Sequence, residues 1–262
     1  MYTLLISLIV GAAAGYFSYW RWDWGWGIGC GVFCFMLSQL VIGLLLRRRL
    51  MALQQRIPEI MADAQNRINR QINLFQLRPP ASMNSARKQL EELQAAAARK
   101  ALAATDDFKV FYRWNFMLER QINVMRVQLL FQLKEYKKVD ALLPKTLVRD
   151  PQTAAIQLVR LYRTEAPIDD FYRSKQRLFK SDDLAFFASV YAWMKLKQED
   201  EAAARAALTE AKKKTDNAVM LENLDRLLNG KAKHYTMSGF GDLWYALGLE
   251  EPRVKAQRRR PY

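Results

Sequence analysis

The sequence is poor in the side chains that most enzymes and metal sites use. It has one histidine, His234, and two cysteines, Cys30 and Cys34, in 262 residues. A single histidine excludes a histidine metal cluster and leaves little material for general-base catalysis, and two cysteines are too few for a four-cysteine zinc site. The sequence also has neither a P-loop nor a Gly-x-Ser-x-Gly elbow. We therefore expect no enzymatic activity, no cofactor and no metal, and the two cysteines to be small packing residues.

Strand signals are also scarce, because no run of alternating Val, Ile and Thr occurs. Apolar residues recur instead at intervals of three and four positions, which is the period of an α-helix. The sequence predicts an all-α fold. Beyond residue 105 we expect seven helices joined by short turns, at 107–133, 135–147, 152–163, 168–179, 183–197, 199–214 and 217–229. Asp106 or Asp107 is expected to cap the first of them.

Charged residues are almost absent from the first 46 positions, where only Arg21 and Asp23 occur. These two residues separate two uncharged runs, Tyr2 to Trp20 and Trp24 to Leu46. Nineteen helical residues extend for about 28 Å, which is close to the thickness of the hydrocarbon layer of a membrane. Three connecting residues cannot form a domain, so the runs must be antiparallel neighbours. The sequence predicts a transmembrane helical hairpin over residues 1–49.

The flanks of the hairpin predict its orientation. Aromatic residues gather around the turn and favour a lipid headgroup layer there: Tyr16, Tyr19, Trp20, Trp22, Trp24 and Trp26. Arg47, Arg48 and Arg49 follow the second run, and basic residues are retained on the cytoplasmic side. We expect both termini in the cytoplasm, with a bacterial inner membrane as the favoured location. The alternative is a cleaved signal peptide with its small-residue site at Ala12 to Ala14.

Small residues form one narrow stripe on each predicted membrane helix. The stripes consist of Ser7, Gly11, Ala14 and Ser18, and of Gly27, Gly31, Cys34 and Ser38. Membrane helices meet where small side chains let their backbones approach. The stripes pack either against each other within the hairpin or between protomers, which leaves a homo-oligomer open.

A juxtamembrane region follows at residues 50–104. An amphipathic helix is predicted over 50–77, with Pro58 as a point of restart. Its apolar stripe must be covered by other helices of the chain, or else by a partner or a second copy. Pro79 and Pro80 end this helix. The Ala-rich segment 82–104 has only a shallow apolar stripe, so we expect a marginal helix or a mobile connector there.

Two stretches of the region 105–230 have the spacing of helical-hairpin repeats. In the first, Leu130, Tyr136, Val139, Leu143 and Pro151 occupy consensus-like places. In the second, Trp193, Ala202 and Ala203 do so approximately, and the consensus Trp-Leu-Gly is absent. These stretches resemble the tetratricopeptide repeat, a helical hairpin of about 34 residues. The resemblance implies a small α-solenoid that binds a protein partner along one face. We expect that face on the helices that begin near Asp107, Thr153 and Asp183.

The net charge of +15 is concentrated at the two flanks of the repeat region. Residues 47–100 carry 11 basic and 4 acidic side chains. The final segment, 231–262, contains a short aromatic helix and a basic tail. We interpret Trp244 either as a cap on the end of the repeat core or, with the tail, as a contact to anionic lipid. The basic residues in question are Arg253, Lys255, Arg258, Arg259 and Arg260.

Basic flanks beside a membrane anchor favour lipid over nucleic acid as the anionic partner. Aromatic residues at helical spacing indicate core packing, and Phe111 to Trp114 is the nearest candidate for a base-stacking surface. A membrane hairpin followed by basic residues and such repeats resembles, in layout, the HemY family of bacterial inner-membrane proteins. We expect a membrane-anchored scaffold that holds a partner protein at the cytoplasmic face. The alternative is a structural subunit of a membrane complex assembled through the hairpin.

Overall fold

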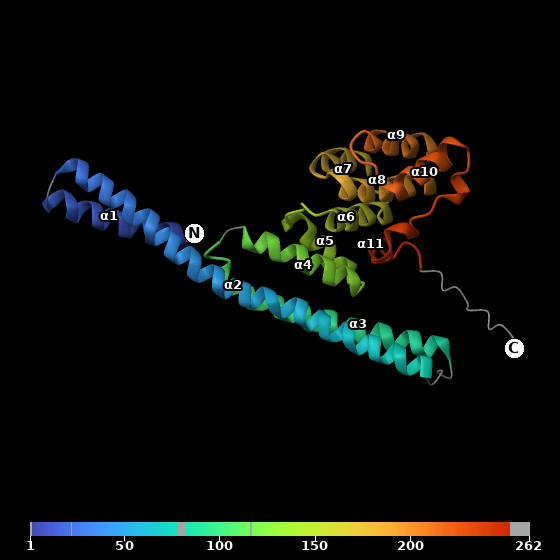
Figure 1. The fold of residues 1–262 in the computed structure, drawn as a ribbon, viewed down its shortest axis with the longest axis horizontal. Helices are drawn as coiled ribbons and strands as arrows, with labels where there is room; N and C mark the ends of the chain where they lie inside the picture. The colour runs from blue at the N-terminus through green and yellow to red at the C-terminus, as the bar shows by residue number, and fades with distance from the viewer. Residues whose placement is uncertain (1, 22, 78–81, 116, 252–262) are drawn as a thin grey trace. The chain divides into compact units, whose positions relative to one another are not determined.

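The chain divides into two compact units, residues 1–147 and 148–262 (Figure 1). The computed structural model describes all residues except 1, 22, 78–81, 116 and 252–262. Every regular element among the described residues is a helix, as predicted. The division between the units falls inside the range 105–230, for which the sequence indicates a single repeat domain. Each unit is therefore described separately.

The first unit is built around one very long helix. Its elements are α1 (Tyr2–Arg21), α2 (Trp24–Leu77), α3 (Met83–Ala104), η1 (Thr105–Phe111), α4 (Leu118–Gln132), α5 (Tyr136–Leu142) and η2 (Leu143–Lys145). The second predicted membrane helix and the predicted helix 50–77 are one continuous helix, α2, of 54 residues. Arg, Leu, Met, Ala and Gln fill residues 44–56 and are strong helix formers, so nothing interrupts the helix there.

Pro58 lies inside α2 and does not divide it. A proline removes one backbone hydrogen bond and normally disfavours a helix interior. Here its neighbour Ile57 is buried in the core of the unit, with Ile60 and Met61 packed against the same cluster. These contacts hold α2 to α3 and η1 on both sides of the proline, which explains why the predicted restart does not occur.

The Ala-rich segment is a regular helix, α3, that lies alongside α2 (Figure 1). Ala98 and Ala101 are completely buried, and Ser82 caps the helix by accepting a hydrogen bond from the Asn84 amide. The expectation of a marginal helix or mobile connector is therefore corrected. Alanine gives a weak hydrophobic signal, but its small side chain lets two helices approach closely. The apolar stripe of α2 is covered by the chain's own helices, as in the first alternative above, and not by a partner or a second copy.

The predicted helix 107–133 is replaced by two separate helices, the 3₁₀ helix η1 and the α-helix α4. Neither aspartate caps an α-helix. Arg126 of α4 donates hydrogen bonds to the Thr105 hydroxyl (2.8 Å), to the Thr105 carbonyl (3.2 Å) and to Asp106 (2.7 Å). The guanidinium thus satisfies polar groups at the start of η1. A continuous α-helix would place residues 105 and 126 more than five turns apart.

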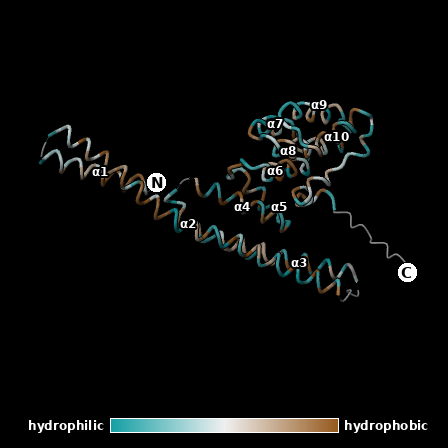
Figure 2. Tube along the Cα trace, viewed as in Figure 1, coloured by the Kyte–Doolittle hydropathy of each residue, from teal (hydrophilic) through white to brown (hydrophobic). Residues whose placement is uncertain are grey.

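The second unit surrounds helix α8. Its elements are α6 (Pro151–Arg163), α7 (Asp169–Lys175), η3 (Gln176–Leu178), α8 (Ser181–Lys197), α9 (Glu201–Lys212), α10 (Ala218–Leu228), η4 (Ala232–His234), η5 (Ser238–Phe240) and α11 (Asp242–Tyr245). All residues of α8 from Leu184 to Lys195 are buried, and α6, α9 and α10 pack around it (Figure 2). A helix buried on all sides offers no surface to a partner, so α8 cannot carry the expected binding face.

A recurring turn ends four of the helices. The residues that follow α4, α6, α8 and α10 adopt the left-handed conformation at Lys134, Glu165, Glu199 and Gly230, with φ between 56° and 67°. In each turn the next amide also bonds back into the helix, as Ala166 does to the Leu161 carbonyl (3.0 Å). This is the Schellman pattern. The four positions are separated by 31, 34 and 31 residues.

The left-handed turns generate a stability prediction. Glu165 has φ 56°, which costs a non-glycine residue roughly 1 kcal/mol. We expect Glu165→Gly to raise the free energy of unfolding by roughly this amount, measured by urea denaturation of the full chain in detergent. Ala206→Gly is the matched control, because Ala206 is an exposed interior position of α9 and glycine there should destabilise by about 1 kcal/mol. A destabilised Glu165→Gly variant would contradict the assignment.

Candidate functional site

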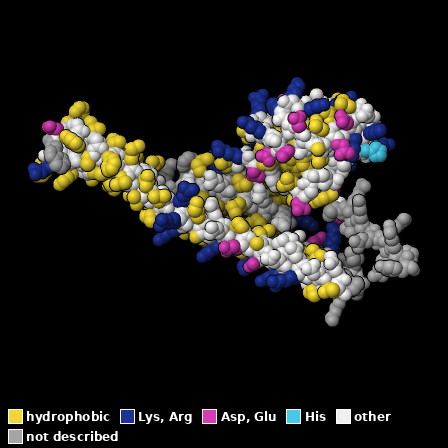
Figure 3. All heavy atoms as spheres, viewed as in Figure 1, with side chains coloured by type: hydrophobic (Ala, Val, Ile, Leu, Met, Phe, Trp, Pro, Cys, Tyr) yellow, Lys and Arg dark blue, Asp and Glu magenta, His cyan; other side chains and the backbone are white. Residues whose placement is uncertain are grey.

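The hairpin of α1 and α2 is apolar on its outer surface (Figures 2 and 3). Leu8 is 64% exposed and Leu45 is 59% exposed, and large apolar side chains are exposed along both helices. The described residues thus include two helices long and apolar enough to cross a membrane. Arg47, Arg48 and Arg49 are all exposed at the end of the apolar part of α2. No protein segment covers this apolar surface in the described structure.

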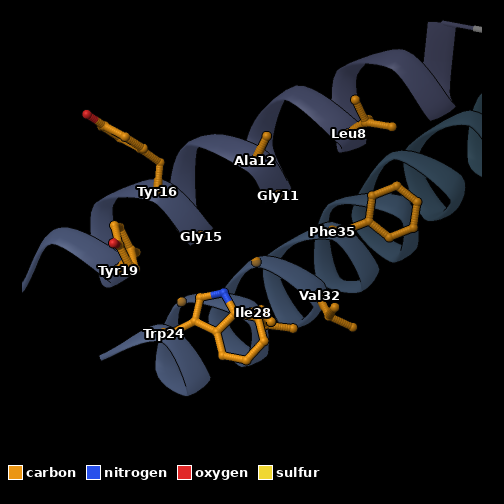
Figure 4. Close-up of a pocket in the computed structure, with 12 residues that line it drawn as sticks. Leu8, Gly11, Ala12, Gly15, Tyr16, Tyr19, Trp24, Ile28, Val32 and Phe35 are labelled. Atoms are coloured by element: carbon orange, nitrogen blue, oxygen red, sulfur yellow. The ribbon is translucent and has the colours of Figure 1, made fainter. Parts of the chain in front are cut away.

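Four glycines bring the two helices into backbone contact (Figure 4). A Cβ atom added at Gly11 would lie 2.9 Å from the carbonyl oxygen of Gly31, and one added at Gly15 would lie 3.0 Å from that of Gly27. Additions at Gly27 and Gly31 meet backbone atoms of α1 at 3.2 and 3.0 Å. Any side chain at these positions would force the backbones apart. Only glycine permits this approach.

The structure places the predicted stripes in this seam, within one hairpin. Ser7, Gly11, Ser18 and Gly27 are buried, while Ala14, Gly31, Cys34 and Ser38 are partly exposed. Gly15 is not part of the predicted stripe, although its spacing from Gly11 matches the small-xxx-small pattern. Gly15 and Gly27 form the second close contact, so the seam consists of two facing pairs of glycines.

An apolar groove of about 730 Å³ runs along one face of the seam (Figure 4). The glycines form part of its floor, and larger side chains flank it, including Tyr16, Tyr19 and Phe35. A different face of α2 is also open. Within the part of the chain that the structure describes, Gly25, Gly29 and Gly43 have no neighbour within 4 Å of an added Cβ. At 100° per residue these three glycines lie opposite Gly27 and Gly31 around the helix. The hairpin therefore presents a second face of small residues outward.

A half-buried polar cluster joins α7, α8 and the start of α9 in the second unit: Lys195 is buried, whereas the Asp169 and Asp200 side chains are each 44% exposed. Lys195 contacts the Asp169 carboxylate at 2.7 Å and Asp200 at 3.8 Å, and the Tyr191 hydroxyl donates to Asp169 at 2.6 Å. Burial alone raises the pKa of Asp169, but the hydrogen bonds from Lys195 and Tyr191 and nearby positive charges outweigh it and lower that pKa. Burial and the bond to Asp169 raise the pKa of Tyr191. One lysine faces two carboxylates, and these ion pairs, with the Tyr191 hydrogen bond, join α7 and α8 to the start of α9.

The C-terminal segment is fastened to α8 by two indoles and one carboxylate. Trp193 and Trp244 lie edge to face at 5.2 Å, and Glu250 accepts hydrogen bonds from both indole N–H groups at 2.9 and 3.2 Å. Trp244 and Leu247 are fully buried. Trp244 therefore caps the core and cannot contact lipid, which corrects the interfacial interpretation. The basic residues proposed with it, Arg253, Lys255, Arg258, Arg259 and Arg260, lie outside the described residues.

Among the described residues, no group of three or more His, Cys, Asp and Glu side chains could hold a metal ion. Comparison of the chain with protein families, curated proteins and solved structures finds no match. The resemblances to the tetratricopeptide repeat and to the HemY layout therefore stay predictions. The outer surface of the hairpin exposes large apolar side chains along both helices, so it favours lipid or a protein partner over water.

The seam predicts different effects of leucine at Gly29 and at Gly31, which are two positions apart in α2. Gly31→Leu should force the helices apart, because its Cβ would meet the Gly11 oxygen at 3.0 Å and the Gly15 Cα at 3.3 Å. Gly29→Leu has open space around it and serves as the matched control. We expect several-fold lower accumulation of Gly31→Leu in the membrane fraction and near-normal accumulation of Gly29→Leu, measured by immunoblotting. Equal accumulation of the two variants would contradict the seam.

Proposed function

We propose that this protein is a membrane-anchored helical scaffold that holds a partner protein at the cytoplasmic face of a membrane. The observation that supports this proposal most directly is the uncovered apolar surface of the α1–α2 hairpin. About 25 cal/mol is lost for each Å² of apolar surface left in water. A lipid bilayer removes that cost along both helices at once.

Two rival interpretations of the hairpin have less support. The core helix of a soluble protein is surrounded by protein, whereas the outer surfaces of α1 and α2 are exposed. A signal peptide cleaved near Ala14 would remove the helix on which Gly27 and Gly31 pack. The paired glycines support retention of α1 as one half of a permanent anchor.

The orientation rests on the three exposed arginines. Lys and Arg beside a membrane helix are retained on the cytoplasmic side. Since α2 continues beyond Arg49 to Leu77, the same helix leads from that face to the other elements of the first unit. An inner membrane of a bacterium fits this arrangement, and anionic lipid there would attract the basic residues.

The recurring turns support the scaffold part of the proposal. Helices that end in left-handed turns 31 to 34 residues apart have the spacing of helical-hairpin repeats, which bind extended partners. Because α8 is buried, we assign partner contact to the outer face of α9. Ala202 and Ala206 are exposed there among charged residues, beside an open hollow of about 870 Å³.

A second function is favoured by a separate observation. Gly25 and Gly29 are four residues apart on a face of α2 where, among the described residues, no atom lies within 4 Å of an added Cβ. Such a pair is typical of contacts between membrane helices. The protein would then be a structural subunit, or a homo-oligomer, assembled through its hairpin.

One experiment separates the two functions with full-length chains. The wild type, an Ala202→Arg/Ala206→Arg variant and a Gly25→Leu/Gly29→Leu variant are purified in mild detergent, and co-purifying proteins are identified by mass spectrometry. Both variants change exposed positions, so circular dichroism should show native helicity. The scaffold proposal predicts that the α9 variant loses its partner and that the glycine variant keeps it. The reverse result would favour the subunit, and retention by both variants would contradict both surfaces.

A further inference from the structure

The chain just before α4 lies against the first residues of α1 (Figure 1). The Tyr2 amide donates to the Arg113 carbonyl at 3.2 Å, and the Thr3 hydroxyl donates to the Trp114 carbonyl at 3.5 Å. The rings of Tyr2 and Trp114 meet edge to face at 5.8 Å. These contacts lie inside the first unit and join segments more than a hundred residues apart. They tie residues 109–114 to one end of the hairpin.

The geometry of the seam fixes the level of that end of α1 relative to the arginines of α2. Gly11 faces Gly31 and Gly15 faces Gly27, so α1 and α2 are paired in an antiparallel register. Continuing that register places Tyr2 beside a residue near position 40 of α2. Arg47 lies about seven residues further on, which is roughly 10 Å along the helix axis. Tyr2, and with it Trp114, therefore lies on the membrane side of the arginines.

The exposed side chains of the segment suit such a depth. Val110 is 72% exposed, although it is a large apolar residue in a unit with a formed core. Phe111, Tyr112 and Trp114 are partly exposed beside it, and Lys109 and Arg113 are exposed on either side. Aromatic rings and long basic side chains favour the headgroup layer, where the apolar part stays dry and the polar end stays wet.

We infer that residues 109–114 insert into the cytoplasmic headgroup layer of the membrane as an interfacial foot. This inference rests on the membrane anchoring proposed above. The foot gives the first unit a second point of attachment besides the hairpin, and Lys109 and Arg113 favour anionic lipid there. A bound lipid surface also explains the exposure of Val110, while Phe111 and Tyr112 pack partly against the core of the first unit.

The inference is tested by spin labelling of the full-length protein in vesicles of phosphatidylethanolamine and phosphatidylglycerol. Cys30→Ala and Cys34→Ala provide the background, and single cysteines are placed at Val110, Leu40 and Leu74. Leu74 is the matched control, because it is an exposed apolar residue of α2 (54% exposed) about 40 Å along the helix from Arg47. Collisions with oxygen report lipid, and collisions with a water-soluble nickel chelate report water.

We expect the oxygen-to-nickel ratio to be highest at position 40, lowest at 74, and several-fold above the control at 110. A ratio at 110 equal to that at 74, with position 40 in lipid, would overturn the foot and leave the anchor intact. A ratio at 40 equal to that at 74 would overturn the anchor itself. If the cysteine-free background does not fold, a photoreactive residue at 110 in the unmodified chain should cross-link to lipid and one at 74 should not, and absence of lipid cross-links at 110 would overturn the foot.

Discussion

The close approach of two glycine pairs is the contact on which the first unit depends. Gly11 with Gly31 and Gly15 with Gly27 hold α1 and α2 so near that an added Cβ has no room. Water does not drive helices together inside a bilayer, so van der Waals contact along such a seam must supply the attraction. The seam also sets the register of the hairpin. Through that register it sets which residues of α1 and α2 lie at the same level of the hairpin.

The continuity of α2 connects the hairpin to the rest of the first unit. The same helix supplies the glycine seam and, from Leu50 onward, the stripe on which α3 and η1 pack. The second unit is stabilised by different means. Its central helix α8 is held by the ion pair of Lys195 and Asp169 and by the carboxylate of Glu250 between two tryptophans. One unit is organised by its long helix α2 and the other by the buried helix α8 with its polar contacts.

The sequence pattern predicted the helices that have a clear apolar period or a long uncharged run. It failed for segments whose structure depends on packing against distant residues. The hairpin, the stripe of α2 and the all-α class follow from composition and spacing. Segment 82–104 was underestimated because alanine is weakly hydrophobic, whereas Ala98 and Ala101 are buried by close helix contact. The 3₁₀ helix η1 depends on a hydrogen bond from Arg126, twenty residues away, which no local pattern contains. Burial of Trp244 likewise depends on a distant partner, Trp193.

The central claim is that the hairpin crosses a membrane twice and returns the chain to the cytoplasm. The most direct measurement places topology reporters at two positions of the full-length protein, in the turn after Arg21 and after Tyr262. A reporter that works only in the cytoplasm should be active after Tyr262 and inactive in the turn, and one that works only outside the cytoplasm should show the opposite pattern. Activity of the external reporter after Tyr262 would contradict the account.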